Sequence, residues 1–347
     1  PQYSTHVPEE MKRSIIVIVI IAVLLVICVA AGMYVYGKVY ARYEGESVRI
    51  YLPSGTDESA MKDSLQTRLG EFGEDVFSVW RLHRADVSRA HGSYVVEPGD
   101  RALDISRRLR SGRQTPIKVT FNNVRTLDQL AERIASKMEW GADDFMAACD
   151  SILPHKGFRK AQFPAAFIPD TYEFFWTTPA VELVKRLSDI RDKFWNEERR
   201  AKAASMGLNP VGIATVASIV EEETAKKDER PKVARLYLNR LKRGMLLQAD
   251  PTVKFAIGDF GLRRIYNTHL TVDSPYNTYK YKGLPPGPIR IPERSTLEAV
   301  LDAPAHNYIY MCAKEDFSGY HNFATDIAEH NRNAARYHRA LSQRNIR

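Results

Sequence analysis

Three consecutive glutamates, Glu221 to Glu223, end a stretch with the pattern of an amphipathic helix. Asn209 and Pro210 are typical of a helix start, because asparagine caps the first turn and the fixed φ of proline suits it. Apolar residues then recur at helical spacing, at Ile213, Val216, Ile219 and Val220. At about 100° per residue, Glu223 continues this face, Glu221 lies nearly opposite and Glu222 about a quarter turn away. The pattern predicts one buried carboxyl group and two that face outward.

A carboxyl group with apolar neighbours could serve as a general acid. Poor solvation of the charged form raises the pKa of such a group toward the range in which it can donate a proton near neutral pH. Glu223 is therefore the candidate catalytic residue. A helix that frays into solvent at Glu221, with all three glutamates in a wet charge cluster, explains the same pattern equally well.

The polar residues that could support this acid follow within about thirty positions. A second helix is expected from Pro231 to Gly244, with an apolar stripe through Val233, Leu236, Tyr237 and Leu241. Asn239 lies beside this stripe, where it could reach across to the first helix. Gln248 and Asp250 flank a turn around Pro251. These polar groups suggest a site, although capping and turn roles explain them as well.

Motifs for metal or cofactor binding are missing from the sequence. The histidines after residue 268 do not have the HExxH-type spacing of a metal site: His269, His306, His321, His330 and His338. The sequence contains no phosphate-binding loop, GxSxG motif or Cys-His signature, so we expect neither a metal ion nor a cofactor. Cys28 lies in an apolar segment, so that Cys149 and Cys312 could pair at most once; buried free thiols fit the pattern better.

Composition and charge limit the possible partners. The 347 residues, of which 44% are hydrophobic, leave room for two modest domains. The formal net charge of +8 suits anionic surroundings such as lipid headgroups, wall polymers or nucleic acid. The charge is spread along the chain and no nucleic-acid-binding module is recognisable, so we expect no nucleic-acid partner.

Residues 14–37 form an almost wholly apolar run that is long enough to cross a bilayer as one helix. Lys12 and Arg13 precede the run, and an aromatic belt follows it at Tyr34, Tyr36 and Tyr40. The run is too long for a cleaved signal peptide. We therefore expect a short cytoplasmic tail at residues 1–13, one transmembrane helix, and export of the larger portion.

The rest of the chain predicts an α+β fold in two parts. Three strand-turn-helix patterns, with strands near residues 48, 93 and 117, predict a small α+β module over residues 45–141. Residues 142–347 predict a mixed α+β domain that carries the glutamates. Its aromatic-rich segment 163–176 could stack on sugar rings, or its aromatics could pin a loop to the core.

Motifs in this order resemble the YceG-like family of endolytic murein transglycosylases over roughly residues 45–342. The motifs are Phe167-Ile-Pro-Asp-Thr-Tyr, Ala217-Ser-Ile-Val-Glu-Glu-Glu-Thr, Leu238-Asn-Arg-Leu, Met245-Leu-Leu-Gln-Ala-Asp-Pro-Thr-Val, Tyr276-Asn-Thr-Tyr and Gly283-Leu-Pro-Pro-Gly-Pro-Ile. Two positions depart from the family pattern: Pro-Ala-Ala precedes Phe167 where many relatives have Glu-Gly, and Glu222 stands where a lysine is frequent. The resemblance implies a membrane anchor, a LysM-like module at residues 45–141 and a catalytic domain at 142–347 that faces the cell wall.

The resemblance also implies a reaction. Such enzymes cleave the MurNAc-GlcNAc bond inside nascent peptidoglycan strands and leave 1,6-anhydro-MurNAc ends, which terminates strand elongation. The catalytic glutamate is the residue before the threonine, Glu223, and it would act first as acid and then as base on the C6 hydroxyl of the substrate. No second carboxylate, metal or cofactor is required. The implied location is the bacterial inner membrane, with the catalytic domain on the extracytoplasmic side and peptidoglycan synthases as possible partners.

Several residues are candidates for fixing the sugars or the acid: Glu221, Asn239, Gln248, Asp250, Tyr276, Asn277 and, more weakly, Asn322. We expect Glu223→Gln to abolish activity and Glu221→Gln to be much milder. Two alternatives stay open, a hydrolase that uses water and leaves reducing ends, and a non-catalytic wall-binding or scaffold protein.

Overall fold

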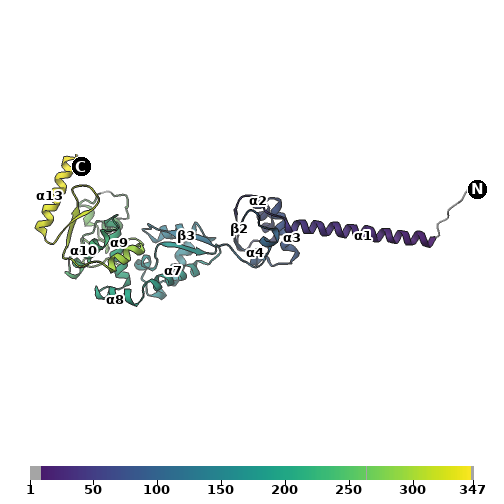
Figure 1. Cartoon of the computed structure of the whole chain (residues 1–347). Helices are drawn as coiled ribbons and strands as arrows, with labels where there is room; N and C mark the ends of the chain where they lie inside the picture. Colours follow the sequence, from purple (N-terminus) through teal and green to yellow (C-terminus); the bar gives the residue numbers. More distant parts are fainter. Residues whose placement is uncertain (1–8, 263, 345–347) are drawn as a thin grey trace, which may run out of the picture. The chain divides into compact units, whose positions relative to one another are not determined.

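The computed structural model describes residues 9–262 and 264–344, and these residues form a mixed α+β fold, as predicted (Figure 1). The chain divides into two compact units. Unit 1 contains the residues up to Ile117 together with Phe175–Thr177, and unit 2 contains Lys118–Phe174 and the residues from Thr178 onward. The first eight residues of the expected cytoplasmic tail lie outside the described residues.

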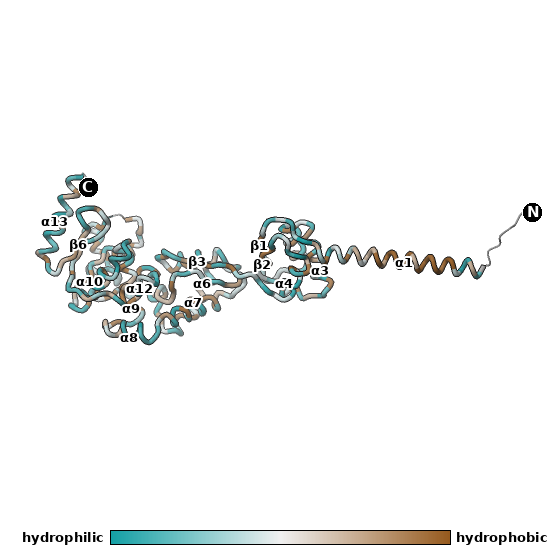
Figure 2. Tube along the Cα trace, in the orientation of Figure 1, coloured by the Kyte–Doolittle hydropathy of each residue, from teal (hydrophilic) through white to brown (hydrophobic). Residues whose placement is uncertain are grey.

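The first helix of unit 1, α1 (Glu9–Tyr40), contains the apolar run. Its segment Glu10–Tyr40 is long and apolar enough to cross a membrane, and Figure 2 shows the run as the brown stretch of the helix. The predicted helix over residues 14–37 is therefore confirmed, and it continues for about one more turn at each end. Near its C-terminal end, Lys38 Nζ lies 2.6 Å from Asp75 Oδ1, which ties α1 to the helix that carries Asp75.

The remainder of unit 1 is built on an antiparallel pair of strands, β1 (Val48–Leu52) and β2 (Gly92–Val96). Two helices, α2 (Glu58–Leu69) and α3 (Glu71–Leu82), lie between the strands in the sequence, and α4 (Ala102–Arg110) follows the second strand. The sequence pattern predicted one helix after the first strand, but the structure has two, α2 and α3. The first predicted pattern is therefore a strand followed by two helices.

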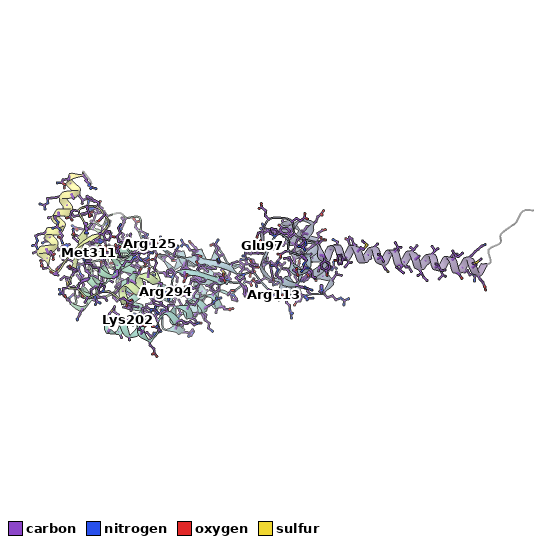
Figure 3. The ribbon with its side chains drawn as sticks, viewed as in Figure 1. Glu97, Arg113, Arg125, Lys202, Arg294 and Met311 are labelled. Atoms are coloured by element: carbon purple, nitrogen blue, oxygen red, sulfur yellow. The ribbon has the colours of Figure 1, made fainter. Side chains whose placement is uncertain are left out.

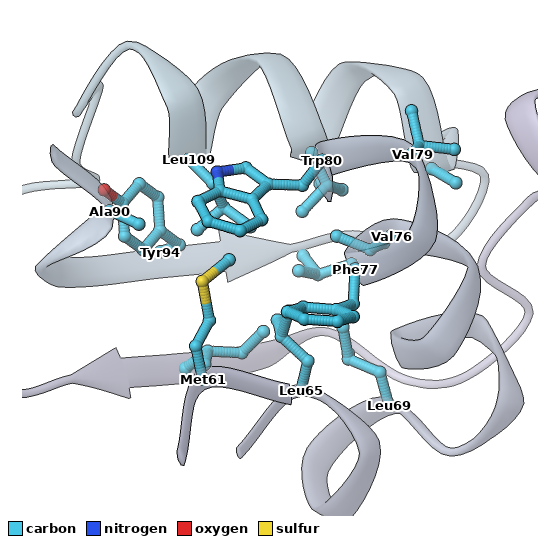
Figure 4. Close-up of a cluster of buried hydrophobic side chains, with 14 of the residues drawn as sticks. Met61, Leu65, Leu69, Val76, Phe77, Val79, Trp80, Ala90, Tyr94 and Leu109 are labelled. Atoms are coloured by element: carbon cyan, nitrogen blue, oxygen red, sulfur yellow. The ribbon is translucent and has the colours of Figure 1, made fainter. Parts of the chain in front are cut away.

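One hydrophobic core joins these elements (Figure 4). Its members from α2, α3 and β2 include Met61, Leu65, Val76, Trp80 and Tyr94. Gly73 allows α2 and α3 to approach closely, because a Cβ atom there would lie 2.2 Å from the carbonyl oxygen of Leu65. Unit 1 thus has a core of its own, which is what allows a small module to be stable.

The third strand-turn-helix pattern belongs mainly to unit 2, contrary to the expected module boundary at residue 141. Its strand β3 (Ile117–Phe121) pairs with β4 (Asp170–Phe174), and its helix is α5 (Leu127–Ala135). The boundary between the compact units lies between Ile117 and Lys118, apart from the short Phe175–Thr177 segment. The local pattern could not reveal this boundary, because the partner strand lies about fifty residues further along the chain.

The other elements of unit 2 are mostly helical. They are α6 (Ala142–Ile152), α7 (Ala180–Phe194), α8 (Glu197–Ser205), α9 (Pro210–Glu223), α10 (Arg230–Lys242), α11 (Asp250–Ile257), α12 (Arg294–Leu301), β5 (Tyr310–Ala313), β6 (His321–Ala324) and α13 (Ile327–Gln343). Helix α9 is central, since it contacts α8, α10, α11 and α12 and is buried continuously from Ile213 to Glu221. The strands β5 and β6 form an antiparallel hairpin.

The aromatic-rich segment 163–176 is pinned to the core. Phe163, Phe167 and Phe174 are almost completely buried, and the Tyr172 hydroxyl donates a hydrogen bond to the Ile168 carbonyl oxygen at 2.6 Å. Of the two alternatives for this segment, the packing role is the one that these side chains adopt. The proline-rich loop, residues 283–289, packs closely against the chain just before this segment. A Cβ atom at Gly287 would be 1.8 Å from the Ala161 carbonyl oxygen.

Candidate active site

Unit 2 contains a cavity of about 460 Å³ at the C-terminal end of α9, and Glu223 lies in its wall. Helices α10 and α11, the β5–β6 hairpin and α13 supply the other walls. The polar lining residues include Tyr237, Gln248, Asp250, Tyr279 and His321. Met311 of the hairpin, labelled in Figure 3, also lines the cavity. Elements separated by about a hundred residues therefore converge on one carboxyl group.

The carboxyl group of Glu223 is held by a phenol. The Tyr237 hydroxyl donates a hydrogen bond to Glu223 Oε1 at 2.6 Å. Burial raises the pKa of Glu223 to about 7; the hydrogen bond from Tyr237 opposes this shift and the charge of Asp250 adds to it. This raised pKa favours a protonated Glu223 close to neutral pH, as a general acid requires.

Tyr237 leaves the second carboxyl oxygen of Glu223 available. Burial and the neighbouring Glu223 raise the pKa of Tyr237 far above its usual range, so the phenol remains a hydrogen-bond donor. Within the part of the chain that the structure describes, Glu223 Oε2 has no hydrogen-bond partner and is not sealed from solvent. The arrangement fixes the carboxyl group through Oε1 and leaves Oε2 unpaired on a residue that lines the cavity.

Gln248 and Asp250, both predicted from the sequence, line the same cavity. The guanidinium of Arg240 donates to Gln248 Oε1, and the Tyr279 hydroxyl donates to Asp250 Oδ1 at 2.5 Å. Burial and the bond to Asp250 raise the pKa of Tyr279, which keeps this phenol protonated too. Each polar group is thereby held in one orientation, which is typical of a site prepared to bind a polar ligand.

Glu221 does not face outward, so that part of the helical-face prediction is wrong. Its side chain is 2% exposed, Oε2 accepts hydrogen bonds from Thr296 Oγ1 at 2.7 Å and from the Glu293 backbone N–H at 2.9 Å, and Oε1 lies 3.0 Å from Arg290 Nη2. The prediction assumed one apolar face and one wet face. Helix α12 and the segment before it cover the second face, so α9 is buried on both sides and Glu221 lies outside the cavity.

Glu222 is also paired with cations. Its carboxylate receives two hydrogen bonds from Arg125, at 3.0 and 3.1 Å, and one from Arg290 at 2.7 Å. Arg290 therefore joins Glu221 and Glu222 in one ionic network behind the cavity. Glu221 and Glu222 therefore share one ionic network, and of the three glutamates only Glu223 lines the cavity.

Two predicted asparagines hold backbone segments instead of lining the cavity. Asn239 Nδ2 donates to the carbonyl oxygens of His306 and Tyr308, at 2.7 and 3.0 Å. Asn277 is fully buried, and its Nδ2 donates to the carbonyl oxygens of Leu270 and Val272. Both side chains satisfy carbonyl groups of irregular segments, which is a common function of buried amides.

Tyr276 and Asn322 likewise do not line the cavity. The ring of Tyr276 packs against Phe255 with centroids 4.7 Å apart, and Asn322 Nδ2 donates to Glu315 Oε2 at 2.7 Å. Cys149 and Cys312 are free thiols, so they do not pair. In the described ranges, no group of three His, Cys, Asp or Glu side chains could hold a metal ion.

Several residues of the cavity wall were not among the sequence-based candidates: Tyr237, Arg240, Tyr279, Tyr310, His321 and His330. The sequence pattern places Tyr237 in an apolar stripe. A buried tyrosine usually has a hydrogen-bond partner for its hydroxyl, and this rule could have identified Tyr237 as a candidate partner of the buried acid. His321 was considered only for metal spacing. No local signal places Tyr279 or the hairpin beside α9.

The raised pKa of Glu223 predicts a pH-dependent gain in stability for Glu223→Gln. The unfolded-state pKa is near 4.5 and the folded-state pKa about 7, so the wild type loses stability as pH rises through this window. Glutamine does not ionise, and the variant should gain about 3 kcal/mol relative to wild type above pH 7 and almost nothing below pH 4.5. Thermal unfolding of both proteins from pH 4.5 to 8 measures this difference. A pH-independent difference would contradict the pKa shift.

Known proteins are similar to this chain in sequence. An endolytic murein transglycosylase from Bacillus subtilis (strain 168) is 29% identical over 336 residues, which cover 89% of this chain and 91% of that protein. An endolytic murein transglycosylase from Streptococcus pneumoniae serotype 2 (strain D39 / NCTC 7466) is 24% identical over 324 residues, and the match covers 83% of this chain and 58% of that protein.

The fold comparison and a family model agree with these relatives. A crystal structure of a YceG-like protein from Listeria monocytogenes superposes with a TM-score of 0.56 at 25% identity, covering 83% of this chain and 98% of that one. The model of the YceG-like family matches residues 50–336, which is far more than half of the sequence. This chain belongs to the YceG-like family.

Proposed function

We propose that this chain is an endolytic murein transglycosylase that cleaves MurNAc-GlcNAc bonds inside peptidoglycan glycan strands and leaves 1,6-anhydro-MurNAc ends. The observation that carries the proposal is the Glu223 carboxyl group, which has a pKa of about 7 and one free oxygen on a residue that lines a cavity. The names of the B. subtilis and S. pneumoniae relatives support the same activity.

The reaction needs one acid and a nucleophile that the substrate supplies. Protonated Glu223 gives its proton to the glycosidic oxygen as the bond from C1 breaks through an oxocarbenium-like state. The C6 hydroxyl oxygen of MurNAc closes on C1, and its proton passes to a base. In the minimal form of the reaction this base is the Glu223 carboxylate itself. Gln248 and Asp250 are placed to hydrogen-bond the sugars, since both line the cavity and both are oriented by their own partners.

The proposal extends to location and domain roles. We propose that α1 is a single-pass anchor in the bacterial inner membrane, with the cavity of unit 2 on the extracytoplasmic side. The length and apolar character of α1 support this. We also propose that unit 1 is a LysM-like module that binds glycan, which its separate core allows, and that peptidoglycan synthases supply the nascent strands.

A product assay tests the proposed function. The full chain in detergent is incubated with purified peptidoglycan, and the released fragments are analysed by mass spectrometry. We expect 1,6-anhydro ends, each lighter by one water than the corresponding reducing end. Reducing ends would identify a hydrolase, and sedimentation with intact sacculi without strand shortening would identify a binding or scaffold protein.

A further inference from the structure

A histidine and a buried carboxylate form a rigid pair in the cavity wall that contains Glu223. His321 is the first residue of β6 and lines the cavity. Its Nδ1 lies 2.8 Å from Glu229 Oε2, and its backbone N–H donates to Glu229 Oε1 at 2.8 Å. Glu229 is 6% exposed and also accepts a hydrogen bond from Thr224 Oγ1 at 3.0 Å. Three donors therefore hold the carboxylate, which in turn holds the imidazole ring.

This pairing determines which ring nitrogen carries the proton. Burial raises the pKa of Glu229, but the hydrogen bonds from His321 and Thr224 outweigh it and leave the pKa below its usual value. An ionised carboxylate only accepts hydrogen bonds, so Nδ1 of His321 must be the donor. Among residues 9–262 and 264–344, Nε2 of His321 has no hydrogen-bond partner. A neutral His321 therefore has a free lone pair at Nε2, and its ring lines the same cavity as Glu223.

We propose that His321 is the base that accepts the proton of the substrate's C6 hydroxyl, so that Glu223 acts mainly as the acid. This inference rests on the proposed transglycosylase function. The O6–C1 bond forms as the C1–O4 bond breaks, the proton of Glu223 goes to O4 of the leaving GlcNAc, and the proton of O6 goes to Nε2. His321 then releases this proton to solvent, and the Glu223 carboxylate takes up a proton from solvent, which restores both groups. Glu229 stabilises the transient imidazolium, as the carboxylate of a His-carboxylate pair does.

Two other histidines near this region lack the same support. His330 lines the cavity, and its ring stacks on the Tyr310 ring with centroids 5.2 Å apart. Its Nδ1, however, is buried without a hydrogen-bond partner in the described part of the chain. His306 Nε2 is occupied by the Lys232 carbonyl oxygen at 2.9 Å. His321 combines a carboxylate at one nitrogen with an unpaired second nitrogen on a ring that lines the cavity, which is the arrangement that proton acceptance requires.

Substrates with different leaving groups separate the acid from the base. One glycan substrate has GlcNAc as its leaving group, and a matched substrate has 4-nitrophenol at the MurNAc C1 position, which leaves without protonation. For the full chain in detergent, we expect His321→Gln to lower kcat at least about 100-fold on both substrates. Glu223→Gln should be inactive on the first substrate and recover most activity on the second. His338→Gln, an exposed position on α13, should match wild type.

Added imidazole distinguishes a missing base from a damaged fold. His321→Ala should regain activity when imidazole is supplied in solution, because the small molecule can accept the proton, whereas a misfolded protein would not respond. A His321→Gln variant within threefold of wild type, a Glu223→Gln variant equally inactive on both substrates, or a failed rescue would each overturn the inference. A wild type that forms no anhydro product would instead refute the proposed function.

Discussion

Glu223→Gln is expected to lower the release of anhydro-muropeptides from peptidoglycan on the order of 10³-fold or more, because glutamine cannot donate a proton to the glycosidic oxygen. The substitution keeps the size of the side chain, and its amide oxygen can still accept the hydrogen bond that Tyr237 donates at 2.6 Å. Binding to glycan and folding should therefore persist. Mass spectrometry of the soluble products, normalised to folded protein, measures the loss.

Glu222→Gln is the matched control for this experiment. Glu222 adjoins Glu223 in the same helical turn, but its carboxylate pairs with Arg125 and Arg290 and does not line the cavity. We expect this variant to retain activity within a few-fold of wild type. Full activity of Glu223→Gln, or loss of activity in Glu222→Gln alone, would show that the wrong carboxyl group has been assigned.

Glu221→Gln is expected to destabilise unit 2 by about 1–3 kcal/mol, since it removes the charge of a buried, hydrogen-bonded carboxylate, although Arg290 keeps Glu222 and Arg230 keeps Glu293 as counter-ions. The side chains of Arg290 and Arg230 are only 7% and 8% exposed, and they lie 3.0 and 3.9 Å from the Glu221 carboxylate. This revises the mild effect expected from the sequence, which assumed a solvent-facing side chain. Molecules that remain folded should still cleave glycan, because Glu221 lies outside the cavity.

Thermal unfolding followed by circular dichroism measures this loss, with Glu298→Gln as the control. Glu298 also pairs with an arginine, Arg199 at 3.3 Å, but its side chain is 41% exposed. Exposed pairs contribute at most about 1 kcal/mol, so the control should unfold close to wild type. Equal unfolding temperatures for Glu221→Gln and wild type would contradict the buried network.

Local patterns were sufficient for the elements that depend on neighbouring residues. The Asn209 cap and the second helix, α10, were predicted and are present, because capping and helix formation depend on residues a few positions apart. The helical spacing before Glu223 also selected the carboxyl group that lines the cavity. Its pKa could be anticipated in direction, since burial at the end of an apolar face was implied.

Contacts between distant segments could not be read in this way. The strands β3 and β4 are far apart in the sequence, and no local pattern shows that they pair. Their pairing places β3 in unit 2, so that the boundary between the units lies after Ile117. Asn239 and Asn277 were expected near the sugars, and instead they satisfy carbonyl groups of loops that the sequence does not place. The same holds for Glu221, because a helix covered on two sides has no outward face.

The sequence by itself determined that an acid ends an apolar helix, that residues 14–37 form an apolar run long enough to span a bilayer, and which motifs the chain shares with the YceG-like family. Only the tertiary structure decided which groups surround that acid. Tyr237, Tyr279 and His321 line the cavity from three separate parts of the chain, which meet because each buries apolar side chains against its neighbours. Packing selects such neighbours by complementary shape, and shape is a property of the folded chain.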